Sequence, residues 1–218
     1  MEMKNIIKLT RLERDALREV VSTALSHSSM ALSKMVDERI DVKLASMDLI
    51  PLSEIPGKLG DEDVLSTGVY IRIIGDISGT TLLVFPRDSA LFLADVLGGR
   101  EAGSTKILTE LDRSALEELG SIITASFLTA MSNFLGIKTY PSPPVTVFNT
   151  AGSIVNFVLM GINKDVDFGL VVRIDFKGRK GVITGYLLLL LYAGSLSVLL
   201  NLLDKRIEES GMPVKKQK

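Results

Sequence analysis

The chain has 218 residues, enough to bury a substantial core as one domain or two small ones. Its 25 Lys and Arg residues nearly balance its 26 Asp and Glu residues, so nothing in the composition suggests the basic surface that nucleic acids or anionic lipids require. The absence of cysteine excludes disulfides, thiolate metal sites and a cysteine nucleophile, and it fits a cytoplasmic location.

The first predicted element is a long helix that begins after Thr10. Thr10 is followed three residues later by Glu13, and this pair is a helix start signal because the two side chains satisfy N–H groups that lack helical partners. Apolar residues then recur at helical spacing and predict a buried face, with Leu17, Val20, Val21, Ala24 and Leu32 among them.

Strands are predicted after this helix, over residues 39–52 and 68–85, where β-branched and apolar residues alternate. Turn residues at Gly75-Asp76 and Ser78-Gly79 favour an antiparallel hairpin. A second helix is expected over residues 88–97, and the short polar stretch 98–104 is the expected seam between the two halves of the chain.

The second half of the chain repeats the first at a constant offset of 99 residues. Residues 108–132 match residues 9–33 at ten positions, where average residue usage would give about two matches. The helix start signal recurs as Thr109 with Asp112. Strands are expected over residues 143–161 and 168–191, with a turn at Lys177-Gly178, and a closing helix over residues 195–209.

These elements predict an α+β domain made of two helix–strands–helix repeats, about 8–98 and 107–207. Their strands are expected to form one antiparallel sheet with approximate two-fold symmetry, and residues 211–218 a frayed tail.

Residues 181–203 carry no charge and are long enough to cross a bilayer as a helix. The equivalent stretch of the first repeat, however, has Pro86, Arg87 and Asp88 at its strand-to-helix joint. A buried strand followed by an amphipathic helix therefore explains residues 181–203 better, and no membrane insertion is expected.

The candidate functional residues lie on the polar faces of the two long helices. Glu19 and Ser22, and likewise Glu118 and Ser121, are three residues apart and so share one helix face. Asp15 and Ser114, four residues before the glutamates, extend the same faces. A polar face is commonly only solvated, but the recurrence of Glu-x-x-Ser at the same offset favours a function.

Other chemistry has little support in the sequence. His27 is the only histidine, so a histidine metal cluster is excluded. A phosphate-binding loop and a nucleophile elbow are also absent from the sequence. We therefore expect neither a cofactor nor a metal in this chain.

The chain resembles the CheC family, which comprises the CheC, CheX and FliY phosphatases. The family pattern is Asp or Ser, then Glu four residues later, Asn three residues after that, and Pro after a further 22 residues. Ser114, Glu118 and Pro144 match this pattern in the second repeat, and Asp15 and Glu19 match it in the first. The phrases ALSKM, GDISGTTLLVF and SALEELGSI also resemble CheC.

The resemblance implies that the helix docks on phosphorylated CheY, the receiver protein of chemotaxis. The glutamate would pair with a receiver lysine, and the asparagine would orient water for attack on the aspartyl phosphate, with the metal supplied by the receiver. Ser22 and Ser121, however, stand where the family has asparagine, and a serine hydroxyl ends roughly one to two bond lengths short of the end of a carboxamide.

This departure leaves two functions open. One is a CheY-P phosphatase with weak catalysis, in which the second site is favoured because Ala45 replaces the proline in the first repeat. The alternative is a non-catalytic binding module for CheY or for the receptor deamidase CheD, or a component similar to the flagellar switch protein FliM.

Overall fold

The two long predicted helices are present and begin where the sequence predicts. The computed structural model describes residues 9–161, 168–179 and 181–209. In it, α1 (Arg11–Val36) and α4 (Glu110–Leu135) each have a complete capping box, formed with Thr10 and Thr109. Each threonine hydroxyl accepts a hydrogen bond from the N–H three residues later, and the acid there accepts one from the threonine N–H.

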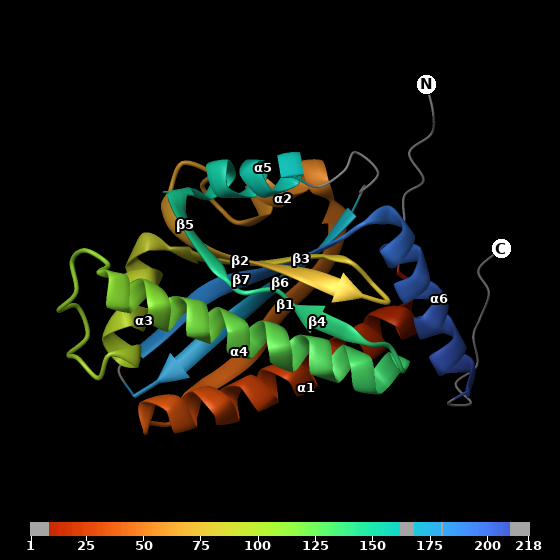
Figure 1. Ribbon diagram of the computed structural model, residues 1–218, viewed down its shortest axis with the longest axis horizontal. Helices are drawn as coiled ribbons and strands as arrows, with labels where there is room; N and C mark the ends of the chain where they lie inside the picture. Colours follow the sequence, from red (N-terminus) through yellow and green to blue (C-terminus); the bar gives the residue numbers. More distant parts are fainter. Residues whose placement is uncertain (1–8, 162–167, 180, 210–218) are drawn as a thin grey trace.

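One antiparallel sheet forms the centre of the molecule (Figure 1). Its strands lie in the order β1-β6-β7-β3-β2-β4, and β5 also pairs with β2. The predicted turns join β2 to β3 and lie at the end of β6, which pairs with β7. The strands are β1 (Asp41–Pro51), β2 (Leu65–Gly75), β3 (Gly79–Pro86), β4 (Thr139–Pro141), β5 (Val145–Thr150), β6 (Phe168–Gly178) and β7 (Gly181–Leu191).

The strand order interlocks the two halves of the chain. The outer strand β1 of the first half pairs with β6 of the second, and β5 of the second half pairs with β2 of the first. Exchanging β1 with β5, β2 with β6 and β3 with β7 leaves the order unchanged apart from its direction. This is the arrangement that a two-fold relation between repeats predicts. The repeat boundaries stay a prediction, and the predicted tail, 211–218, lies outside the described residues.

Helices cover both faces of the sheet. The helices α1, α3 (Arg87–Leu97), α4 and α6 (Ala193–Glu209) contribute to the core on one face, and α2 (Ile55–Lys58) and α5 (Ala151–Gly161) to the core on the other (Figure 1). In β7, Leu187 and Leu189 belong to the first core, whereas Leu188 and Leu190 belong to the second. Burial on both faces explains the continuous apolar run of this strand. Among the described residues, none of the helices has the length and apolar character needed to cross a bilayer.

The prediction of strand over residues 143–161 is wrong in its second part. Only Val145–Thr150 is a strand, and Ala151–Gly161 is helix α5. Ile154, Val155 and Val158 are buried at helical spacing, and the Thr150 hydroxyl accepts a hydrogen bond from the N–H of Ser153 as a helix cap does. A short apolar run rich in Ile and Val fits both the helical period of 3.6 residues and the strand period of 2, so the sequence did not reveal this helix. The short segments η1 (Leu52–Glu54) and α2 were not predicted either.

Candidate docking and catalytic site

The two candidate sites lie at opposite ends of one helix pair. Helices α1 and α4 run side by side in opposite directions, as the colour change along each shows (Figure 1). Glu19 therefore lies beside the C-terminal end of α4, and Asn133 and Phe134 of α4 border the same hollows as Glu19. The two predicted sites are thus separate surfaces of one helical layer.

The first site is open to solvent. Asp15, Glu19 and Ser22 are all exposed, as the polar face of α1 predicts. Asp15 forms an exposed ion pair with Arg11, with 3.8 Å between Arg11 Nε and Asp15 Oδ2. The side chains of Glu19 and Ser22 have no hydrogen bond or ion pair with any residue that the structure describes, so both are available to a partner.

Two hollows border Glu19. One, of about 560 Å³, lies between Asp15 and Glu19 of α1, the end of α4 and Arg206 of α6. The other, of about 270 Å³, is bordered by Glu19, His27 and Asn133. Asn133 is exposed on α4 and borders both hollows. The sequence did not point to Asn133. Its equivalent in the first repeat is Lys34, so the residue is not repeated, and nothing in the sequence indicates which residues of α4 face Glu19.

The second site, on α4, likewise presents a glutamate and a serine three residues apart. Ser114 and Glu118 are exposed, and Ser121 is half-buried. Neither Glu118 nor Ser121 forms a hydrogen bond or ion pair within the described part of the chain. Pro144 is half-buried directly before β5, the strand that pairs with β2.

Two contacts that the sequence did not reveal fix α4 at the second site. The Glu117 carboxylate accepts hydrogen bonds from the N–H and the hydroxyl of Thr146, at 3.1 and 2.8 Å, and so ties β5 to the helix. Gly120 lies against the sheet, because a Cβ placed there would lie 2.6 Å from Cγ1 of Val69 in β2. A glycine at this position thus lets α4 approach the sheet closely.

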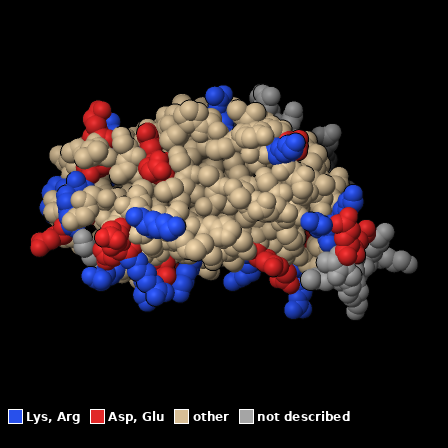
Figure 2. Space-filling model, turned by 60° about the horizontal axis from the view of Figure 1, so that its bottom comes forward, with Lys and Arg blue, Asp and Glu red and all other residues tan. Residues whose placement is uncertain are grey.

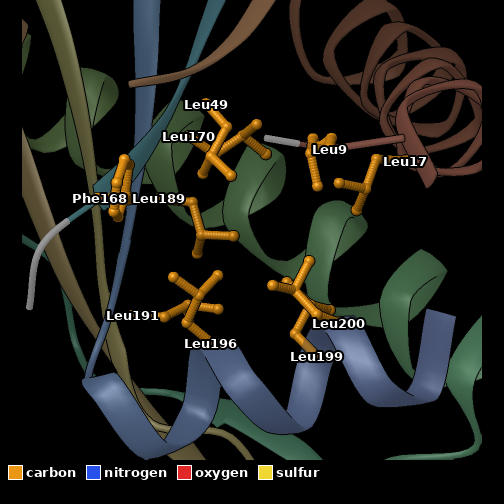
Figure 3. Close-up of a pocket in the computed structure, with 10 residues that line it drawn as sticks. All are labelled: Leu9, Leu17, Leu49, Phe168, Leu170, Leu189, Leu191, Leu196, Leu199 and Leu200. Carbon is orange, nitrogen blue, oxygen red and sulfur yellow. The ribbon is translucent and has the colours of Figure 1, made fainter. Parts of the chain in front are cut away.

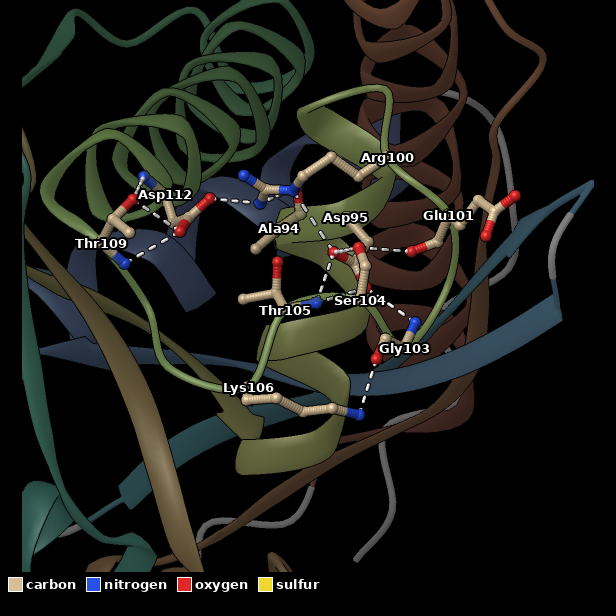
Figure 4. A network of polar contacts seen from close by, with 10 residues as sticks. All are labelled: Ala94, Asp95, Arg100, Glu101, Gly103, Ser104, Thr105, Lys106, Thr109 and Asp112. Atoms are coloured by element: carbon tan, nitrogen blue, oxygen red, sulfur yellow. Dashed lines mark hydrogen bonds and ion pairs between the residues drawn. The ribbon is translucent and has the colours of Figure 1, made fainter.

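A buried carboxylate organises the segment that joins the two halves (Figure 4). Asp95 accepts hydrogen bonds from the N–H groups of Gly103 and Thr105, at 2.7 and 3.0 Å, and from the Ser104 hydroxyl at 2.8 Å. Burial by itself would raise the pKa of Asp95, but these hydrogen bonds outweigh it and lower the pKa to about 2. The Arg100 guanidinium connects Asp95 to Asp112, the capping residue of α4.

The chemistry available at the two sites is that of exposed carboxylates beside hydroxyl groups. The outer face of the α1 and α4 layer comes forward in Figure 2, where acidic and basic side chains lie close to one another around the margin of a broad uncharged area. In the described ranges, no group of three or more His, Asp or Glu side chains could hold a metal ion. A carboxylate on such a face can pair with a cation of a docking partner.

Comparison with known proteins defines the class first. The fold is that of Thermotoga maritima FliY, whose crystal structure matches with a TM-score of 0.76 at 18% sequence identity, over 92% of this chain and 100% of that chain. The molecule is therefore an α+β protein of the CheC-like fold.

The sequence comparisons then confirm the resemblance to the CheC-like family, whose model matches residues 111–148. The chain is 26% identical to the CheY-P phosphatase CheC of Bacillus subtilis over 73% of this chain and 78% of that protein. It is 29% identical to the flagellar motor switch phosphatase FliY of Bacillus subtilis, over 66% of this chain and 37% of that protein. The family match covers all but the first residue of α4 and the first four residues of β5, and thus includes Ser114, Glu118, Ser121 and Pro144.

Proposed function

We propose that this protein docks on phosphorylated CheY in the cytoplasm and promotes hydrolysis of its aspartyl phosphate. The observation that carries the proposal is the exposure of Glu19 and Glu118, neither of which pairs with a described residue, on twin antiparallel helices. The name of its Bacillus subtilis relative, CheY-P phosphatase, supports the choice of CheY as the partner. In the mechanism that the resemblance implies, each glutamate pairs with a lysine of the receiver, which also supplies the metal.

The serines set the expected rate. Ser22 and Ser121 can bind water through their hydroxyls, but they end roughly one to two bond lengths short of a carboxamide, and a misplacement of about 1 Å can cost about 100-fold in rate. At the first site, Asn133 of α4 borders both of the hollows that Glu19 of α1 borders. Its carboxamide is therefore available beside Glu19. We therefore propose slow hydrolysis, with Asn133 contributing to the first site.

The same serines favour a second candidate function, a binding module that holds CheY without hydrolysing its phosphate. This alternative keeps the docking role of Glu19 and Glu118 and assigns no role to water. Binding of CheD and a role similar to FliM stay predictions of the family resemblance.

Loss of phosphate from CheY, measured with this protein in excess, distinguishes the two functions. We expect acceleration by the wild type, partial loss in Glu19→Ala and in Glu118→Ala, and complete loss in the double variant. In the Glu118→Ala background, Asn133→Ala should remove most of the remaining acceleration. If the wild type gives no acceleration although CheY binds, the phosphatase proposal is wrong and the binding module stands.

A further inference from the structure

Equivalent spaces lie between the helices and the sheet beside the starts of α1 and α4, but only the one beside α1 is filled. Beside the start of α1, Leu9 and Leu49 border a space of about 10 Å³, the size of one water molecule (Figure 3). The residues 99 positions later, Leu108 and Phe148, border a hollow of about 490 Å³ beside the start of α4. The fold therefore does not by itself require this hollow to be open.

The difference comes from the closing helices. Leu196, Leu199 and Leu200 of α6 point into the first space and fill it (Figure 3). The corresponding helix α3 contributes only Arg87 and Leu91 to the second. Apolar side chains are consequently left exposed around the second hollow, with Leu65 58% and Ile107 81% accessible. An apolar hollow of this size with a few polar groups is typical of a binding site.

The charge around the second hollow is positive. Arg87, Lys106 and Arg113 border it, and neither Asp nor Glu is among the described residues that do. Lys106 Nζ donates to the carbonyl of Gly103 at 2.7 Å, and the Arg113 guanidinium lies 4.6 Å from the centre of the Phe148 ring. Lys106 and Arg113 form no ion pair with a described carboxylate.

Arg87 is partly engaged. It donates to the carbonyl of Lys106 at 3.0 Å and lies 3.8 Å from the exposed carboxylate of Asp88. Two of the three cations, Lys106 and Arg113, are therefore available to an anionic partner.

The rim of the hollow is held in place before any partner arrives. The hydrogen bonds of Asp95 fix residues Gly103, Ser104 and Thr105, which directly precede Lys106 and Ile107 (Figure 4). A preformed rim reduces the entropy cost of binding.

We propose that this hollow binds a peptide segment of a partner protein in which a large apolar side chain is flanked by Asp or Glu. The apolar side chain enters between Leu91, Leu108 and Phe148, and the flanking carboxylates pair with Lys106 and Arg113. The exposed apolar rim favours a peptide over a small anion, because it offers contact beyond the hollow itself. The proposal does not depend on Glu19 or Glu118.

Selection of phage-displayed random peptides on the wild-type protein tests the proposal. Peptides that are enriched should combine Leu, Ile or Phe with neighbouring Asp or Glu. A synthetic copy of such a peptide should bind at least tenfold more weakly to the double variant Lys106→Glu/Arg113→Glu. The matched control is Arg14→Glu, which reverses an exposed charge at the equivalent position of α1 and should leave binding unchanged.

Circular dichroism spectra and unfolding temperatures of the variants establish that each one folds. Enrichment of basic or uncharged peptides, equal binding to the charge-reversal variant, or a similar loss in Arg14→Glu would overturn the proposal. A dimer of this chain that Arg113→Glu disrupts would also overturn it, since a second copy would then be the occupant.

Discussion

Thr146 and Glu117 join the edge strand of the second half to the helix that carries Glu118. The Glu117 carboxylate accepts two hydrogen bonds from Thr146, from its N–H and from its hydroxyl. Pro144 lies two residues before Thr146, so the contact also holds the proline of the family pattern near α4.

We expect Glu117→Ala to lower the free energy of unfolding by about 1–3 kcal/mol, because it leaves two donors of Thr146 without an acceptor. Glu117→Gln should cost less, since its amide oxygen can still accept. Urea denaturation measures both, and Glu118→Ala is the matched control, expected within about 0.5 kcal/mol of the wild type because Glu118 is exposed. Equal effects at the two neighbouring glutamates would contradict this assignment.

The close approach of α4 to the sheet gives a second prediction. Gly120→Ala places a methyl group 2.6 Å from Cγ1 of Val69, an overlap that should cost about 1–3 kcal/mol, partly offset by about 1 kcal/mol of helix propensity. Val69→Ala removes the opposing atom, so the double variant should be more stable than the sum of the single effects predicts. If the changes in the free energy of unfolding are additive in this double-mutant cycle, the contact between residues 120 and 69 does not limit the packing.

Restoring the family residue tests the reason given for slow hydrolysis. Ser121→Asn should accelerate phosphate loss from CheY by about 10- to 100-fold, because the carboxamide reaches the position that the hydroxyl does not. Thr129→Asn, exposed two turns further along α4, is the control and should have no effect. If Ser121→Asn leaves the rate unchanged, the missing carboxamide is not what limits catalysis.

The free energy of unfolding should depend on pH through Asp95, the buried carboxylate that binds the segment joining the two halves. The pKa of Asp95 is lowered to about 2 from an ordinary value of 3.8, and that of Asp112 is lowered as well. The stability that their charged forms contribute is therefore complete above about pH 4 and is lost as the pH falls toward 2.

Urea denaturation at a series of pH values should accordingly give a free energy of unfolding that decreases between pH 4 and pH 2. The decrease should be smaller in Asp95→Asn, which cannot titrate. The pKa of Asp204 is raised by burial and by the nearby Glu13 and Glu208, so its protonation favours the folded state as the pH falls and opposes this decrease. An equal decrease in Asp95→Asn would show that other groups are responsible.

Local signals in the sequence determined which parts of this structure were predictable. Thr10 with Glu13 and Thr109 with Asp112 predicted both long helices, because a capping box depends only on residues three apart. The single antiparallel sheet was also predicted, from the repeated strand runs. Helix α5 was missed, because its short apolar run fits either period.

The contacts that hold the candidate sites were not predictable, since they join residues far apart in the chain. Glu117 meets Thr146 across 29 positions, and Gly120 meets Val69 across two different elements. Asn133 comes beside Glu19 only because the two helices run antiparallel. The exposed positions of Glu19, Ser22 and Glu118 agree with their predicted helix face, whereas their roles stay predictions.

The central claim is that Glu19 and Glu118 each dock one phosphorylated receiver. Isothermal titration with CheY carrying beryllofluoride, a stable analogue of the aspartyl phosphate, measures this directly. We predict two receivers bound per chain for the wild type and for the exposed control Glu110→Ala, one for Glu19→Ala or Glu118→Ala, and none for the double variant. Unchanged affinity and stoichiometry in the double variant would contradict the claim.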